Sequence, residues 1–278
     1  MSDMPSKNQG AWVWYELMTP DAAASKAFYE KVVPGWTIQT SHGGGDDGTS
    51  PGEKPYGFIS NADGGMTGGV LTLSEDMLKG GAHPAWVGYI AVDDTDAMVK
   101  AIEAKGGKVL MPPTDIEMAG RVAMVADCCG APFYIMKPTP PPGQPDAESD
   151  VFSAQPRDGR CGWNELMAGN QAKALDFYAS LFGWQTDHTP PMDMGEMGQY
   201  VFITHNGTDV GAIMQKTADM PAPMWSHYFY VPSVTTAKAS AEAAGGTVIN
   251  GPMEVPGGQW IIQGIDPQGA MFALVGGK

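Results

Sequence analysis

Short apolar segments alternate with amphipathic ones along the chain, and their order predicts a repeated βαβββ pattern. Aromatic and apolar side chains in residues 12–18 favour a strand. Residues 22–33 follow a helix start at Thr19-Pro20-Asp21 and place Phe28 at helical spacing, which predicts a helix packed on a sheet. Short strands are then expected at 36–40, 56–60 and 69–73, and the pattern restarts with a strand at 86–92, a helix at 94–105 and strands at 108–111, 121–126 and 132–137.

The second half of the chain repeats the first. Glu16-Leu17-Met18 recurs as Glu165-Leu166-Met167, Gly35-Trp36 as Gly183-Trp184, Pro84-Ala85-Trp86 as Pro223-Met224-Trp225, and Asp127 and Gly130 as Asp266 and Gly269. Self-similarity of this kind indicates a tandem duplication. We therefore expect one domain at 10–138, a second at 159–278, and a Pro-rich acidic linker at 139–158, a composition typical of semi-rigid, solvated chain.

Charge and cysteine content narrow the classes of partner. Of 278 residues, 16 are Lys or Arg and 31 are Asp or Glu, a net charge of −15, and no segment clusters basic residues as a phosphate-binding groove requires. Nucleic acid and membrane are therefore excluded as expected partners, and a small-molecule ligand is favoured. Three cysteines, two of them adjacent, indicate a reducing cytoplasmic location. The oligomeric state is left open.

The repeated motifs resemble those of a known superfamily. Paired βαβββ units, a Phe-Tyr pair near the end of the first helix, a following Gly-Trp and a closing Asp266-Pro267-Gln268-Gly269 turn are similar to the vicinal oxygen chelate superfamily. That group contains glyoxalase I, bleomycin-resistance proteins and extradiol dioxygenases. The resemblance implies an α+β fold in which the two βαβββ units of each copy form an incomplete barrel around a cleft.

The resemblance also implies where a metal ion would bind. Metal enzymes of that superfamily place His, Gln or Glu on three strands, and the corresponding positions here are Trp14 and residues close to Val87 and Tyr134, then Trp163 and residues close to Ser226 and Ala273. Divalent ions of this kind prefer imidazole and carboxylate ligands. We therefore expect no metal at the chelate position of either copy, and no cofactor.

Two carboxylates are the leading candidates for chemistry. Glu16 and Glu165 lie two residues after Trp14 and Trp163, so strand alternation puts each on the same face as its tryptophan, the cleft face in the resembled fold. A desolvated carboxylate there could act as a general base. The alternative is a structural Glu that pairs with a backbone NH or an Arg.

Further candidates depend on strand register. His227 is a possible proton carrier, although the register used here points it toward the helix. Arg121 could turn inward and pair with Glu16. Aromatic side chains expected on the cleft face, either to stack a planar substrate or to fill the core, are Trp14, Trp163, Tyr89, Tyr134 and Tyr228. Those expected to pack between helix and sheet are Trp86, Trp225, Phe28, Phe177, Trp36 and Trp184.

Cys128 and Cys129 occupy the turn that holds Pro267 and Gln268 in the second copy. No basic residue adjoins them in sequence to favour a thiolate, which argues against a redox role.

Three functions remain open. The first is an enzyme, of lyase or oxidoreductase type, that acts on a small apolar or aromatic compound with Glu16 or Glu165 as base or hydrogen-bond acceptor. The second is a protein that sequesters such a compound without turnover. The third is a metal enzyme with displaced ligands, such as Glu16 or Glu165 with His227. Because Arg121 is expected beside Glu16, Glu165→Gln should impair ligand chemistry more, and Glu16→Gln should cost more stability.

Overall fold

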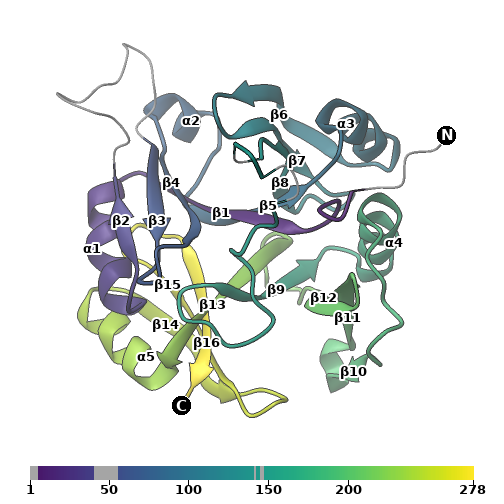
Figure 1. Ribbon diagram of the computed structural model, residues 1–278. Coiled ribbons are helices and arrows are strands. Elements are labelled where there is room, and N and C mark those ends of the chain that lie inside the picture. The colour runs from purple at the N-terminus through teal and green to yellow at the C-terminus, as the bar shows by residue number, and fades with distance from the viewer. Residues whose placement is uncertain (1–5, 41–55, 141, 145–146) are drawn as a thin grey trace. The chain divides into compact units, whose positions relative to one another are not determined.

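The computed structural model (Figure 1) describes residues 6–40, 56–140, 142–144 and 147–278. The first copy contains β1 (Trp12–Thr19), α1 (Ala22–Val32), β2 (Thr37–Gln39), β3 (Tyr56–Ser60), β4 (Met66–Thr72), α2 (Glu75–Lys79), β5 (Ala85–Ala91), α3 (Thr95–Ala104), β6 (Lys108–Ile116), β7 (Gly120–Ala126) and β8 (Pro132–Pro138). The second contains β9 (Cys161–Ala168), α4 (Gln171–Phe182), β10 (Met192–Asp193), the 3-10 helix η1 (Gly195–Met197), β11 (Gln199–His205), β12 (Thr208–Gln215), β13 (Met224–Ser233), α5 (Val234–Ala243), β14 (Thr247–Glu254), β15 (Trp260–Ile265) and β16 (Met271–Gly277). The short elements α2 and η1 are additions to the expected pattern, and β10 is the counterpart of β2 in the second copy.

Within the described residues, each copy forms one mixed sheet of eight strands. The orders are β2-β3-β4-β1-β5-β8-β7-β6 and β10-β11-β12-β9-β13-β16-β15-β14, so the second order is the first with every strand number raised by eight. The pair β1 and β4 is parallel, and so is its counterpart β9 and β12. The predicted tandem α+β fold with matching strand order is therefore confirmed, and both sheets are open.

Contacts group the described chain into two compact units, and each unit takes one part from each copy. Unit 1 contains Met1–Val13, Gly88–Ser149 and Trp163–Trp225, and unit 2 contains Trp14–Val87, Asp150–Gly162 and Ser226–Lys278. The expected domain boundaries, 10–138 and 159–278, follow the sequence repeat and the two sheets, and they stay a prediction.

A buried hydrogen-bond chain joins the two copies within unit 2. Asp21 caps α1 by accepting a bond from the Ala24 NH, and the helix then buries Tyr29 on its inner face. The Trp86 Nε1–H donates to the Tyr29 hydroxyl over 2.9 Å, and that hydroxyl donates to Asp266 Oδ2 over 2.9 Å. Figure 1 shows α1 and α5, one from each copy, side by side in this unit. Burial raises the pKa of both Asp266 and Tyr29.

Unit 1 contains the matching hydrogen-bond chain, in which the Trp and Tyr come from the second copy and the Asp from the first. Trp225 Nε1–H donates to the Tyr178 hydroxyl over 2.9 Å, and the hydroxyl donates to Asp127 Oδ2 over 3.3 Å. Asp127 and Asp266 also accept backbone NH groups of their own turns, at 2.7 and 3.0 Å in the first copy and 2.9 Å for both bonds in the second. We call each of these chains a Trp–Tyr–Asp relay.

A second tryptophan of each copy also reaches the other copy. Trp36 Nε1–H donates to the Gly159 carbonyl and Trp184 Nε1–H to the Gly10 carbonyl, over 2.9 and 2.8 Å. Gly159 has φ +78°, and a Cβ there would lie 2.0 Å from Asn61 Oδ1. The six aromatic residues predicted to pack between helix and sheet are all buried, which confirms that prediction.

Part of the expected linker contacts the folded chain, although residues 154–158 are exposed. Val151 is buried, and the Arg160 side chain, which is 0% exposed, bonds to Asp150 Oδ2 at 2.8 Å and to Asp63 Oδ1 at 3.2 Å. Arg157 also pairs with Asp63. These ion pairs hold the segment before β9 against the β3–β4 turn in unit 2.

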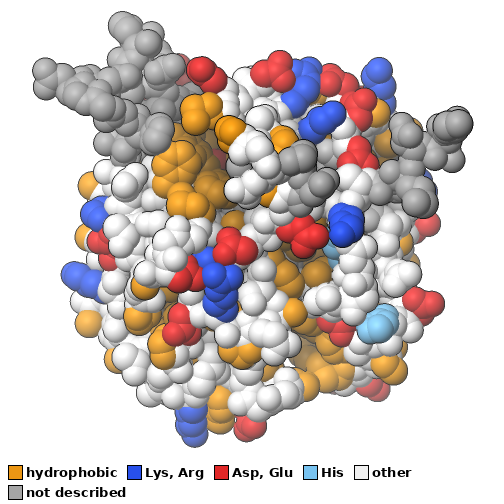
Figure 2. Space-filling view, in the orientation of Figure 1, with side chains coloured by type: hydrophobic (Ala, Val, Ile, Leu, Met, Phe, Trp, Pro, Cys, Tyr) orange, Lys and Arg blue, Asp and Glu red, His pale blue; other side chains and the backbone are white. Residues whose placement is uncertain are grey.

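None of the described helices is long and apolar enough to cross a membrane. On the face shown in Figure 2, Lys and Arg side chains are scattered among Asp and Glu and form no continuous basic stretch.

We predict that Tyr29→Phe destabilises the protein by about 1–3 kcal/mol, because it leaves a buried indole NH and a buried carboxylate without their common partner. Tyr178→Phe should cost less, since its bond to Asp127 is longer. Urea unfolding followed by circular dichroism measures both changes. Unchanged midpoints in both variants would show that the relays contribute nothing.

A second prediction concerns acid stability. The Gly65 NH, Arg157 and Arg160 lower the pKa of Asp63 from 3.8 to about 2. A carboxyl with a lowered folded pKa adds stability above its unfolded pKa and loses it as the pH falls through the folded value. The Tm of Asp63→Asn should therefore lie below that of the unaltered protein at pH 6, and the gap should narrow between pH ~4 and ~2. A gap that stays constant over this range would contradict the assignment.

Candidate functional site

One face of β9 is buried and the other is partly open. Residues 162, 164, 166 and 168 are buried, whereas Trp163, Glu165 and Met167 are half-buried. This alternation follows from the two-residue period of a strand with one face against a helix layer. The residues singled out in the sequence, Trp163 and Glu165, thus share the open face.

A hydroxyl from β11 links these two side chains. Trp163 Nε1–H donates to the Tyr200 hydroxyl over 2.7 Å, and that hydroxyl donates to Glu165 Oε2 over 2.8 Å. Phe202 lies edge-on to both rings, with centroids 5.9 Å from Trp163 and 5.5 Å from Tyr200. We call Trp163, Glu165, Tyr200 and Phe202 the second-copy cluster.

Strand register explains why these residues meet. Phe202 pairs with Ala212 on β12, and Ala212 pairs with Glu165 on β9, so the three side chains share one face. Ala212 is small, which lets the phenol of Tyr200 reach across the central strand to the carboxylate.

The first copy holds an equivalent first-copy cluster of Trp14, Glu16, Tyr56 and Phe58. Trp14 Nε1–H donates to the Tyr56 hydroxyl over 2.8 Å, and Phe58 again lies edge-on to both rings. Here the central residue is Gly69, the register partner of Glu16, and a Cβ there would lie 2.1 Å from the Tyr56 hydroxyl. Tyr56 therefore lies directly over the glycine.

The two carboxylates differ in exposure. Glu16 is 2% exposed, whereas Glu165 is half-buried. Burial, and then the neighbouring Glu165 carboxylate, raise the pKa of Tyr200 well above its ordinary value. Tyr200 is therefore a neutral hydrogen-bond donor to Glu165, the more exposed of the two carboxylates.

The remaining predicted aromatic residues form two further groups. Tyr89 and Tyr134 are stacked in unit 1, with centroids 4.2 Å apart and an interplanar angle of 11°. In unit 2 the Tyr228 hydroxyl accepts a bond from Gln263 Nε2 over 2.7 Å, and Gln263 Oε1 accepts one from Asn250. The three tyrosines are buried, so packing and substrate contact remain alternatives for them.

The two other candidates, His227 and Arg121, lie outside the clusters. His227 is 2% exposed and lies against the Tyr15 ring, and burial lowers its pKa to about 3. It is therefore neutral near pH 7, which favours a packing role. Arg121 bonds to Asp96 at 2.6 and 2.9 Å and pairs with Asp115 at 3.0 Å. The hypothesis that Arg121 pairs with Glu16 is therefore wrong, because nearer carboxylates on α3 and β6 take the guanidinium.

The side chains at the expected chelate positions do not suit a divalent ion. Trp14 and Trp163 use their indole NH groups as donors, Val87 and Ala273 are apolar, and Tyr134 is stacked. In the part of the chain that the structure describes, the one group of three or more His, Cys, Asp or Glu ligand atoms within 4.8 Å is Asp127, Cys128 and Cys129. We derive no reaction step through a metal ion at the chelate positions.

Sequence reasoning missed four members of the clusters: Tyr56, Phe58, Tyr200 and Phe202. A signal for them was present, because Tyr-x-Phe opens the matched strand of both copies. The motif predicts a cluster only when the order of the three strands is known, and the pattern of a single strand does not reveal that order.

Comparison with known proteins identifies the family and the fold. The family model described as Glyoxalase/Bleomycin resistance protein/Dioxygenase superfamily matches residues 12–135 and 160–274. CFP32 of Mycobacterium tuberculosis, whose name suggests a glyoxylase, is 30% identical over 277 residues, which cover 98% of each chain. The anthracycline biosynthesis protein DnrV of Streptomyces peucetius is 31% identical over 278 residues, covering 96% of this chain and 93% of DnrV.

Solved structures share the fold at low sequence identity. The Mn(II)-bound glyoxalase from Novosphingobium aromaticivorans superposes with a TM-score of 0.59 at 15% identity, covering 98% of this chain and 83% of that one. The 2,2',3-trihydroxybiphenyl 1,2-dioxygenase from Sphingomonas wittichii gives a TM-score of 0.60 at 12% identity, covering 96% and 90%.

The buried position of His227 generates a pH prediction. Its folded pKa lies below its unfolded value of 6.5, so the unfolded chain binds more protons, and stability falls as the pH drops from above 6.5 toward 3. We expect this residue to contribute a loss of about 1 kcal/mol per pH unit between pH 6 and 4. His227→Gln should flatten the dependence of unfolding free energy on pH by that amount, and an unaltered slope would contradict it.

Proposed function

This chain belongs to the Glyoxalase/Bleomycin resistance protein/Dioxygenase superfamily, and we propose that it binds a small, largely apolar or aromatic organic molecule on the partly open aromatic face of its sheets. The proposed ligand lies against the indole of Trp163 and the ring of Phe202, and Glu165 accepts a hydrogen bond or a proton from it.

The observation that carries this proposal is the second-copy cluster. Trp163, Tyr200 and Phe202 are half-buried beside a carboxylate, so part of this aromatic surface is open to a bound molecule. Apolar walls with a few placed polar groups are typical of small-molecule sites. The repetition of the same four residue types in the first-copy cluster supports a selected arrangement.

Hydrogen bonding prepares Glu165 for this role. The Tyr200 hydroxyl holds Oε2 through a bond of 2.8 Å, and Tyr200 is itself fixed by the Trp163 indole. The carboxylate is therefore oriented before a ligand arrives, which reduces the entropy lost on binding. Glu16 is more deeply buried, so we assign ligand chemistry to Glu165 and a structural role to Glu16.

Likeness to DnrV suggests the ligand class. That relative is named for anthracycline biosynthesis, and we propose a planar, polycyclic aromatic ketone as the ligand of this chain. Such a molecule can stack on indole and phenyl rings and present a phenol or an acidic C–H to Glu165.

Since all three cysteines are free thiols, we place this activity in the reducing cytoplasm.

Ligand binding tests the proposal. Calorimetry with a panel of anthraquinones and of aliphatic ketones should show binding of the planar aromatic compounds only. Glu165→Gln and Trp163→Ala should each weaken this binding at least tenfold, whereas Glu16→Gln should weaken it less and lower the Tm more. Equal losses of affinity for the two Gln variants would refute the assignment of Glu165.

A second readout separates an enzyme from a sequestering protein. The bound compound is recovered after incubation and analysed by mass spectrometry and by exchange of its acidic hydrogens with deuterated water. Exchange that Glu165→Gln abolishes supports proton transfer by Glu165. Unchanged compound with full affinity supports sequestration and rejects catalysis.

A further inference from the structure

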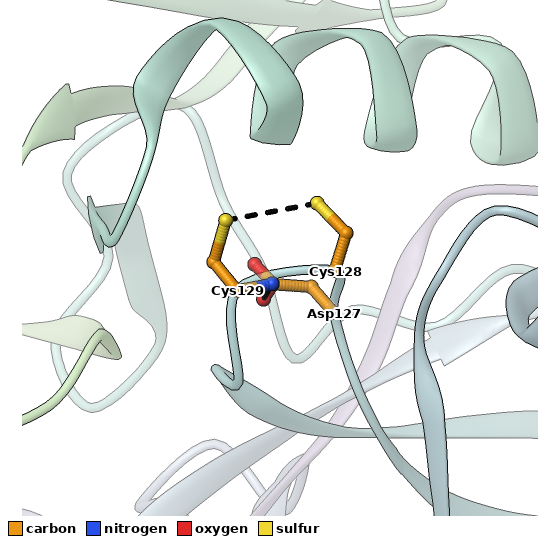
Figure 3. A group of neighbouring side chains, drawn as sticks. All are labelled: Asp127, Cys128 and Cys129. Atoms are coloured by element: carbon orange, nitrogen blue, oxygen red, sulfur yellow. Dashed lines mark hydrogen bonds between the residues drawn. The ribbon is translucent and has the colours of Figure 1, made fainter.

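Two adjacent thiols lie together on the β7–β8 turn in unit 1. Cys128 Sγ and Cys129 Sγ are 3.8 Å apart, and the Asp127 carboxylate lies within 4.8 Å of both sulfur atoms. Figure 3 shows both thiols on one side of the turn, directed toward helix α4. Cys129 Sγ lies 3.9 Å from the carbonyl oxygen of Asn170, the residue that caps this helix.

The turn does not need these thiols. In the second copy, Asp266 accepts NH bonds from Gln268 and Ala270 with the same pattern that Asp127 uses for Cys129 and Ala131. Pro267 and Gln268 therefore support the same turn without sulfur. The thiols of the first copy are available for another role.

Ions and small molecules can reach Cys128 from a surface groove. The groove has a volume of about 320 Å³ and is lined by Lys105, Cys128, Ala172, Lys173, Asp176 and Phe177. Both cysteines are partly exposed, in contrast to the buried Cys161. The dithiol is thus a surface feature rather than part of the core.

We propose that Cys128 and Cys129 together bind one thiophilic divalent ion of the zinc group. Two thiolates on a tetrahedral zinc ion, with bonds of about 2.3 Å, lie about 3.8 Å apart. The observed separation of 3.8 Å already matches this bite, so binding requires little movement of the turn. Water or a small ligand from the groove completes the coordination, and Asp127, which holds the turn through its NH bonds, positions the two thiols.

Charge and proton balance are consistent with such a site. Cysteine binds a metal ion as the thiolate, so binding displaces thiol protons. On binding, the ion forms a bond to each sulfur, and the thiol protons pass to the buffer. Lys105 and Lys173 line the same groove, and Lys105 pairs there with Asp176 over 3.3 Å.

Cadmium and zinc titrations of the full chain test this site. Reduced, chelator-treated protein should bind one cadmium ion per chain, with the ultraviolet absorption of a thiolate-to-cadmium charge transfer and release of at least one proton per ion. Zinc should compete for the same site in the presence of a chromophoric chelator.

Matched variants identify the ligands. Cys128→Ser and Cys129→Ser should each weaken cadmium binding at least tenfold, and Cys161→Ala should leave it unchanged. The double variant Cys128→Pro/Cys129→Gln reproduces the second-copy turn, so it should fold with an unaltered Tm and lose the charge-transfer absorption; Cys128→Ser/Cys129→Ser replaces it if that variant does not fold. Cadmium binding that survives in the double variant, or no binding by the unaltered protein, overturns the proposal.

Discussion

The Trp–Tyr–Asp relay is the interaction on which both compact units depend. In each unit an indole NH, a phenol and a carboxylate are buried together, and each group satisfies the next. Burying any of them alone would cost several kcal/mol, because an unpaired polar group loses its bonds to water. The tyrosine belongs to one copy and the aspartate to the other, so the relay stabilises the pairing of the copies as well as the local packing.

The two copies differ on the sheet face that carries the aromatic clusters. Tyr29 and Tyr178 tie the helix layer to the core, while the opposite faces of β1 and β9 carry the two aromatic clusters. Gly69 and Ala212 occupy equivalent positions, yet a Cβ at Gly69 would collide with the Tyr56 hydroxyl, whereas Ala212 carries one. The packing that both copies repeat thus leaves the open face and the turns of one copy free to differ from those of the other, as the Cys128-Cys129 turn illustrates.

Repetition within the sequence was sufficient to predict that the two copies share one strand order, since each matched block marks the same element twice. The repetition could not predict which residues form hydrogen bonds with the repeated ones. Tyr29 bonds to Asp266, 237 residues away and in the other copy, and no local pattern indicates which aspartate accepts a given hydroxyl. The prediction for Arg121 was wrong for the opposite reason. Its partners Asp96 and Asp115 are close in sequence and compete with the distant Glu16. Prediction therefore succeeded where periodicity decides and failed where competing partners decide.

The exchange of parts between the two units bears on how such a chain arises. A single βαβββ-βαβββ copy contains part of each unit, and alone it would leave Tyr29 and Asp127 without their partners from the other copy. Two separate copies could bury those groups only as a homodimer with reciprocal contacts. The segment at 139–158 makes that association intramolecular, with an effective concentration on the order of millimolar for a short tether. The tandem chain is in this sense a covalently fused dimer, and fusion frees each half to specialise without the risk of pairing with its own twin.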